Sequence, residues 1–139
     1  MASKRKGFTM VELIFVVIFL GILAAIAIPK ITGSTESATL ASMKNDARTN
    51  ITAENTYYIQ NQEYMDAAVD GGDTGAIAPL GDSDIKVVAS PNNSVTITAQ
   101  ECGDGTKGYT LQITSTKTDK TIDYDSCNDA SIRVTNPAP

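Results

Sequence analysis

The chain has 139 residues, enough for one domain and a membrane segment but not for two sizeable cores. Its formal net charge of -5 argues against nucleic acid as the main partner. It contains no histidine, so the most versatile acid–base side chain and commonest metal ligand is missing. These features favour a structural or binding protein over an enzyme.

An apolar segment dominates the N-terminal part. Residues 13–28 form 16 consecutive non-polar positions, and three more apolar residues just upstream bring the segment to about 20, the length that spans a bilayer. Three cations at positions 4–6 precede it and Lys30 follows, which places the N-terminus in the cytoplasm and the rest outside. The segment also carries one acid, Glu12. A carboxylate within a membrane helix costs about 2.5–3.5 kcal/mol at mid-bilayer, so Glu12 calls for a functional explanation.

Three interpretations of this segment compete. A cleaved secretory signal is favoured by an A-x-A site at residues 25–27, but its apolar core would be long and Glu12 would interrupt it. A plain single-pass anchor explains the orientation but not Glu12. The third interpretation treats Gly7 and Phe8 as a processing site and Glu12 as a functional residue.

Helical periodicity continues beyond the apolar segment. We expect one helix from about Phe8 to about Asn61, apolar over 8–29 and amphipathic over 30–63, with Gly21 and Pro29 as weak points where it breaks or kinks. Its apolar positions recur at three- and four-residue steps: Leu40, Met43, Ala47 and Ile51. The positions between them predict a solvated face: Lys44, Asn45, Asp46, Arg48 and Asn50.

The second half of the chain has strand and turn signals. Residues 64–84 are rich in Gly, Asp and Pro and predict a connecting loop. Residues 85–139 contain four stretches with period-two, β-branched content: 85–90, 94–101, 109–116 and 120–127. The predicted fold class is therefore α+β, a long N-terminal helix packed on a small antiparallel sheet with its other face in water. Tyr57, Tyr58 and Tyr64 are expected to seat the sheet on the helix.

Two cysteines, Cys102 and Cys127, lie in this C-terminal region. In an exported segment they predict one disulfide, which would stabilise the fold by about 3 to 4 kcal/mol on a chain-entropy model. Two buried free thiols are the alternative.

The N-terminal residues resemble those of the type IV pilin and type II secretion pseudopilin superfamily. That family combines a short basic leader, a Gly-Phe junction, an acid five residues into the mature chain and an apolar helix ending near a proline. This chain supplies the corresponding residues in register: Gly7, Phe8, Thr9, Glu12 and Pro29. The resemblance covers about 30 residues, and it implies that a prepilin peptidase removes residues 1–7 and N-methylates Phe8.

The resemblance also gives Glu12 a role. Cleavage exposes an amine at Phe8, and Glu12 of one subunit would neutralise the Phe8 amine of a neighbour and so set the axial register. The alternative is that Glu12 reaches the headgroups as a bystander. Close helix packing would be allowed by four small residues: Gly21, Ala24, Ala25 and Ala27.

The function that follows is a structural subunit of a type IV pilus-like filament. Its expected partners are copies of itself, a prepilin peptidase, an inner-membrane assembly platform and, before assembly, the membrane. It would start as a single-pass inner-membrane protein and end in an extracellular pilus, a fimbrium on the cell surface. The alternatives are a type II secretion system pseudopilin in a periplasmic pseudopilus, or a minor tip or DNA-uptake pilin.

Other chemistry has weaker signals. Some pseudopilins carry calcium in a C-terminal loop, and the Asp-rich loop here offers candidates: Asp70, Asp73, Asp82 and Asp84. The spacing is not that of an EF-hand, and turn-forming, solubilising aspartates are the favoured interpretation. No cofactor is otherwise expected, and no catalytic set is evident from the sequence.

Overall fold

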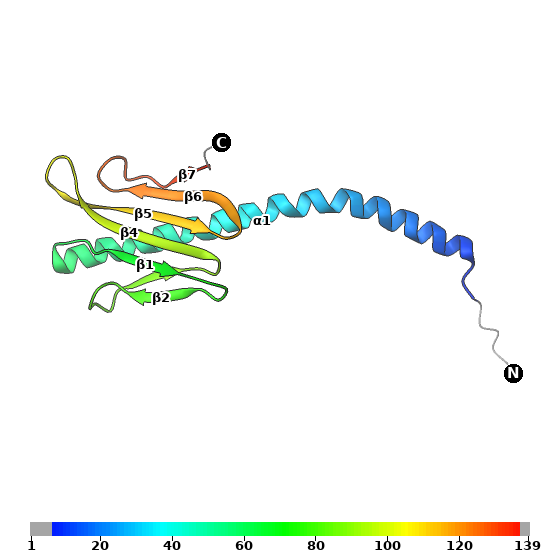
Figure 1. Ribbon diagram of the computed structural model, residues 1–139, viewed down its shortest axis with the longest axis horizontal. Helices are drawn as coiled ribbons and strands as arrows, with labels where there is room; N and C mark the ends of the chain where they lie inside the picture. The colour runs from blue at the N-terminus through cyan, green and yellow to red at the C-terminus, as the bar shows by residue number, and fades with distance from the viewer. Residues whose placement is uncertain (1–6, 137–139) are drawn as a thin grey trace. The chain divides into compact units, whose positions relative to one another are not determined.

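A single long helix followed by short strands makes up the fold (Figure 1). The computed structural model describes residues 7–136, and for residues 26–33 within the helix it describes the backbone but not the side chains. Helix α1 spans Met10–Asn61, and the chain divides into two compact units, Met1–Thr35 and Glu36–Pro139, with α1 contributing to both. The predicted α+β class, a long N-terminal helix followed by an antiparallel sheet, is confirmed.

The strands of the second unit form two antiparallel sheets. The larger has the order β1-β4-β5-β6-β7 and the smaller pairs β2 with β3. The longest strands of the larger sheet, β4 and β5, have nine residues each and lie in its interior. The bounds are β1 Ala67–Asp70, β2 Ala76–Pro79, β3 Lys86–Ala89, β4 Asn93–Glu101, β5 Lys107–Ser115, β6 Thr118–Asp125 and β7 Arg133–Thr135.

The segment expected to be a connecting loop, residues 64–84, contains two of these strands. Both β1 (sequence AAVD) and β2 (sequence AIAP) have few β-branched residues, so their local signal is weak. They form because a partner strand is available: β1 pairs with β4 and β2 pairs with β3. The same holds for β7, which adds three residues to the edge beside β6.

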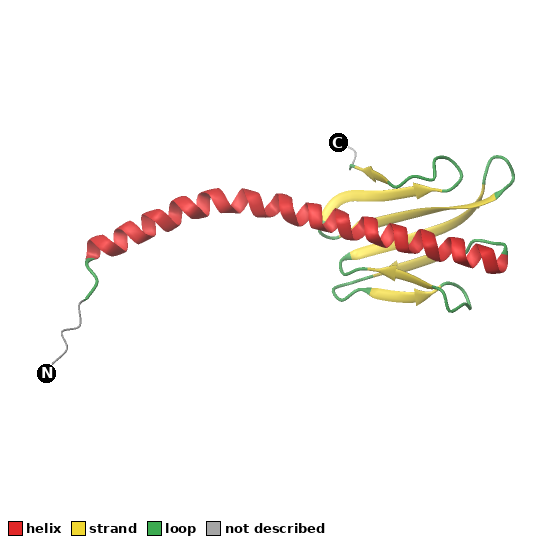
Figure 2. Ribbon diagram, turned by 180° about the vertical axis from the view of Figure 1, so that it is seen from behind, coloured by secondary structure: helices red, strands yellow, loops and turns green. Residues whose placement is uncertain are grey.

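The core lies between one face of the larger sheet and α1, from Glu36 onward (Figure 2). Strands β4 and β5 alternate as expected for a sheet with one wet face: Val95 and Ile97 are buried, whereas Thr96 and Thr98 are exposed. The helix contributes apolar residues at helical spacing, and the remaining core comes from the strands and from Leu80. The principal buried residues are Met43, Ala47, Tyr57, Val69, Leu80, Val87, Val95, Ile97, Tyr109, Leu111, Ile113 and Ile122.

Two helix residues predicted to face water are instead buried: Asp46 and Asn50 are 1% and 0% exposed. The Asn50 side-chain amide pairs with the backbone of Val88 as a neighbouring strand would. Its Nδ2 donates to the Val88 carbonyl and its Oδ1 accepts from the Val88 N–H, both at 2.8 Å. Asp46 accepts from the Ser90 N–H at 2.9 Å, from the Ser90 hydroxyl at 2.6 Å and from Asn93 Nδ2 at 2.8 Å. The polar residues were assigned to solvent because periodicity alone does not reveal a hydrogen-bonded partner. They fix α1 against β3 and the start of β4.

Candidate assembly site

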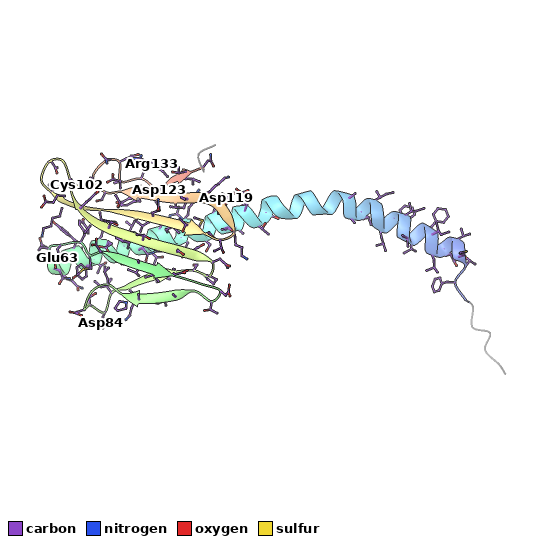
Figure 3. The ribbon with its side chains drawn as sticks, in the orientation of Figure 1. Glu63, Asp84, Cys102, Asp119, Asp123 and Arg133 are labelled. Atoms are coloured by element: carbon purple, nitrogen blue, oxygen red, sulfur yellow. A yellow bond between two sulfur atoms is a disulfide. The ribbon has the colours of Figure 1, made fainter. Side chains whose placement is uncertain are left out.

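Large apolar side chains surround the first part of α1 on every side. Thirteen of them between Phe8 and Leu23 are at least half exposed, from 52% for Ile14 to 86% for Phe8. Figure 3 shows them radiating from this stretch of the helix. Because isolated folded chains rarely leave so much contiguous apolar surface in water, this segment is built to contact lipid or other protein. The thirteen exposed apolar residues are Phe8, Met10, Val11, Leu13, Ile14, Phe15, Val16, Val17, Ile18, Phe19, Leu20, Ile22 and Leu23.

Glu12 lies in the first turn of α1 and is bound to Thr9. The Thr9 N–H donates to Glu12 Oε2 at 2.8 Å and the Thr9 hydroxyl donates to the same oxygen at 2.9 Å. In return the Glu12 N–H donates to Thr9 Oγ1 at 3.3 Å. Since α1 begins at Met10, Thr9 is the N-cap and Glu12 the third helical residue. This reciprocal pattern is a capping box.

A helix cap formed by Thr9 and Glu12 was not predicted from the sequence, although a T-x-x-E motif directly before an apolar segment is the known signature of a capping box. The capping box engages only one of the two Glu12 carboxylate oxygens. Both Thr9 donors reach Oε2, and among the described residues Glu12 Oε1 has no hydrogen-bond partner. An N-cap contact and a second cationic partner for Glu12 are therefore compatible.

The other N-terminal residues are accessible. Phe8 is 86% exposed, and a methyl group added at Gly7 or at Gly21 would meet nothing within 4 Å. The helical assignment runs through both Gly21 and Pro29, and the Pro29 side chain lies outside the described residues. Their role as weak points stays a prediction, as does the leader, whose residues 1–6 also lie outside the described chain.

A membrane span was predicted for residues 8–29. Among the residues that the structure describes, no helical stretch is both long enough and apolar enough to cross a bilayer.

The predicted disulfide is present: Cys102, just after β4, is bonded to Cys127, just after β6. Gly108 on β5 lies against the bond. A Cβ at this position would stand 2.6 Å from Cys102 Sγ and closer still to Cys127 Sγ, so only glycine fits. The bond links the ends of β4 and β6, the two strands that flank β5 in the sheet.

The weak calcium candidates are not gathered into a site. Across the described residues, no group of three Asp, Glu, Cys or His side chains is placed to hold a metal. Asp70 is instead held by the Gly72 N–H and the Ser94 hydroxyl, which lower its pKa. Asp73, Asp82 and Asp84 lie exposed in turns.

A buried carboxyl group and a row of tyrosines close the far end of the helix–sheet interface. Glu54 is 0% exposed; its Oε2 accepts from the Met65 N–H at 3.3 Å and its Oε1 has no partner. Burial raises its pKa to about 7, an effect that the Met65 N–H opposes and the Asp66 charge reinforces. The neighbouring rings contact one another in sequence: Tyr58 with Tyr64, Tyr64 with Tyr109, and Tyr109 with Tyr124. Tyr57, Tyr58 and Tyr64 thus join helix to sheet as expected.

Comparison with known proteins identifies the family. The chain is 31% identical over 120 residues to the type IV major fimbrial protein FimA of Dichelobacter nodosus, which is 86% of this chain and 71% of that protein. The chain belongs to the type IV pilin and type II secretion pseudopilin superfamily. Within this superfamily it is also similar to the type IV major pilin protein PilA of Myxococcus xanthus, 34% identical over 65 residues. A third relative is the type II secretion system core protein G of Pseudomonas aeruginosa, 33% identical over 61 residues.

Coverage of the pilin relatives is uneven. The match spans 47% of this chain and 30% of PilA, and 44% of this chain and 43% of core protein G. No protein-family model matches the chain, and no solved structure matches it significantly. The assignment of the chain to the superfamily therefore rests on its similarity to these relatives, together with its α+β pilin-like fold.

Proposed function

We propose that the chain is a structural subunit of a type IV pilus-like filament and polymerises through its N-terminal apolar helix. The observation that carries this proposal is the ring of thirteen apolar side chains between Phe8 and Leu23, exposed by half or more in a single chain. Such a surface needs a partner on all sides, which lipid provides before assembly and neighbouring helices provide within a fibre. The related pilin PilA and fimbrial protein FimA support the same function.

The N-terminal chemistry of the proposal starts with cleavage. A prepilin peptidase would cut after Gly7 and methylate the new N-terminus at Phe8. Glu12 of one subunit would then pair through its unoccupied Oε1 with the Phe8 amine of a neighbour. A misplaced neighbour leaves an acid unpaired in an apolar environment, so the pair would set axial register.

Before assembly, the apolar segment 8–29 would hold the chain in the inner membrane with its N-terminus in the cytoplasm, next to the assembly platform. The three cations at residues 4–6 support this orientation. The filament would then carry the second unit outward as part of an extracellular pilus. This makes the role structural rather than catalytic.

A type II secretion pseudopilin is the second candidate, favoured by the similarity to core protein G over 61 residues. Both candidates share the assembly mechanism and differ in where the filament ends, on the cell surface or in the periplasm. Shearing of cells separates them, because only a surface pilus yields a fibre band.

The experiment that tests the proposal is N-terminal analysis of sheared fibres from wild-type, Glu12→Val and Gly7→Leu cells. We expect wild-type fibres whose subunits begin at N-methylated Phe8. Glu12→Val should be cleaved normally yet give few or no fibres, and Gly7→Leu should retain residues 1–7 and give none. Glu12→Gln, which keeps the shape but not the charge, separates charge pairing from packing. Normal fibres from Glu12→Val would contradict the register role.

A further inference from the structure

Two cations stand on the outer face of α1 without a partner. Arg48 is exposed and Lys44 half-buried, one helical turn apart, and neither makes an ion pair within the described residues. The two ion pairs found there use other cations, Lys120 with Glu36 and Arg133 with Asp129. Like charges at i and i+4 on a helix repel by a few tenths of a kcal/mol. The repulsion between Lys44 and Arg48 therefore destabilises the helix slightly, and no ion pair within the described residues compensates for it.

An acidic hollow lies on the outer face of the larger sheet, the face that α1 does not cover. It has a volume of about 360 Å³ and its floor is polar: Thr96, Thr98, Thr110 and Gln112. Its wall carries Asp123 and Asp125 from β6, and Arg133 from β7 stands beside Asp123 in the register of the sheet (Figure 3). Arg133 is bonded to Asp129 at 3.0 Å and its charge also acts on Asp123 and Asp125, so one cation stands against three carboxylates and the surface stays net negative.

Both carboxylates stay ionised over the physiological range. Partial burial acts to raise the pKa of Asp123, but hydrogen bonds, including those from Gln112 at 2.9 Å and Thr121 at 3.0 Å, lower it overall. Asp125 has its pKa lowered first by Asn128 and then by the Cys127 N–H. Asp123 accepts from the side chains of Gln112, Thr121 and Thr135, which leaves room for one more donor, because a carboxylate accepts about four hydrogen bonds. Asp125 already accepts from Gln100, Cys127 and twice from Asn128, so it would attract a cation through its charge.

The spacing of the two charged pairs matches. Residues four apart on a helix are separated by about 6 Å along the axis, since each residue rises 1.5 Å. Residues two apart on a strand are separated by about 6.5 Å and point to the same face. Lys44 and Arg48 can therefore oppose Asp123 and Asp125 as two ion pairs formed together, whereas a single cation would leave one carboxylate unmatched.

The two surfaces also lie on opposite sides of the second unit. Helix α1 packs on one face of the larger sheet (Figures 1 and 2), and the hollow is lined by outward-facing strand residues such as Thr96 and Thr98. They cannot meet within one chain. A contact between different faces of identical subunits is heterologous, and unless its rotation closes a ring it repeats without end. That is the contact a filament requires.

We infer that Lys44 and Arg48 of one subunit dock into the hollow at Asp123 and Asp125 of a second copy, forming a lateral contact between the second units of the filament. The inference rests on the proposed filament function and adds an interface to it outside the apolar helix. This interface is electrostatic, so it orients neighbouring subunits and weakens as salt rises.

The test compares fibre yield from full-length chains in cells. Lys44→Glu/Arg48→Glu should lower sheared fibre by about tenfold or more, the effect of losing a few ion-pair contacts per subunit. Lys86→Glu/Lys117→Glu is the matched control, because it reverses two other exposed cations with the same change in net charge. Adding Asp123→Lys to the first variant should recover fibre. Wild-type yield from Lys44→Glu/Arg48→Glu would overturn the inference.

A second measurement does not depend on the folding of charge-reversed sheets. In fibres of Arg48→Cys/Asp123→Cys, mild oxidation should link subunits into a ladder of dimers and higher multimers, and Lys86→Cys/Asp123→Cys should not. Fibres that form but give no ladder from the first pair overturn this contact alone. Failure of the proposed function looks different, since wild-type cells would then give no fibre with an N-terminus at Phe8.

Discussion

Thr9 and Glu12 hold each other at the start of α1: the Thr9 N–H and hydroxyl donate to Glu12 Oε2 at 2.8 and 2.9 Å, and the Glu12 N–H donates to Thr9 Oγ1 at 3.3 Å. Two helix N–H groups that would otherwise lack partners are satisfied in this way. The contact also restrains the carboxylate and leaves Oε1 for another partner. Glu12 thus has a structural role in the single chain in addition to the proposed pairing between chains.

Replacing Thr9 separates these two roles. Thr9→Val keeps the shape of the side chain but removes the capping hydroxyl, which is worth about 1 kcal/mol at an N-cap. Because it also frees Glu12 to move, we expect normal cleavage after Gly7 but roughly fivefold less fibre. Thr9→Ser restores the hydroxyl and should restore the yield. Equal fibre from all three chains, measured by shearing and mass spectrometry, would show that the cap does not contribute to assembly.

Asn50 should be the polar residue whose loss most weakens the helix–sheet joint. Asn50→Ala removes both hydrogen bonds to Val88 and leaves a backbone N–H and C=O without partners in a half-buried position. We expect a loss of about 2 to 4 kcal/mol in the free energy of unfolding. Asn45→Ala, at an exposed position of the same helix, should change it by less than about 0.5 kcal/mol. Denaturant unfolding of the detergent-solubilised chain measures both, and equal losses would refute the bridging role.

Gly108 should be required for the disulfide. Gly108→Ala places a Cβ far inside van der Waals contact with both sulfurs, so either the bond fails to form or β5 shifts. Loss of the bond itself would cost about 3 to 4 kcal/mol for a loop of 25 residues. Gly103→Ala, where an added Cβ meets nothing, is the matched control. Thiol labelling of unfolded chains reports the bond, and full oxidation of Gly108→Ala with unchanged stability would contradict the packing argument.

Glu54 should make the second unit less stable as pH rises toward neutrality. Its pKa is about 7 in the folded chain and 4.5 in the reference state, so between these values the folded chain holds a proton that the unfolded chain has lost. Stability is then highest below about pH 4.5 with respect to this group and declines by up to about 3 kcal/mol as pH approaches 7. Carboxylates with lowered pKa, such as Asp70 and Asp104, act in the opposite direction only at lower pH.

The measurement for Glu54 is the thermal midpoint of the detergent-solubilised chain at several pH values between 5 and 8. The wild-type midpoint should fall across this range, and Glu54→Gln, which cannot ionise, should flatten the curve. Glu63→Gln changes an exposed acid two residues beyond the end of the same helix and should leave the slope unchanged. A flat wild-type curve would mean that Glu54 is solvated or paired in solution.

Residues that act within a few positions of one another could be predicted from the sequence. The long helix follows from spacing at Met43 and Ala47, the central strands from alternation in residues 94–101 and 109–116, and the family from Gly7, Phe8 and Glu12. The T-x-x-E cap belongs to the same class of signal, since Thr9 and Glu12 are three positions apart. Local patterns are sufficient there because local contacts create the structure.

Contacts between distant segments were decided only by the tertiary structure. Asp46 and Asn50 look like solvated helix residues until β3 and β4 supply their partners, 38 to 47 positions away. Strands β1 and β2 have too little β-branched content to be recognised and form because β4 and β3 pair with them. The physical reason is the same in each case: a buried polar group or a short strand is stable only when its hydrogen-bond partner is present, and no single segment of sequence contains both halves of such a pair.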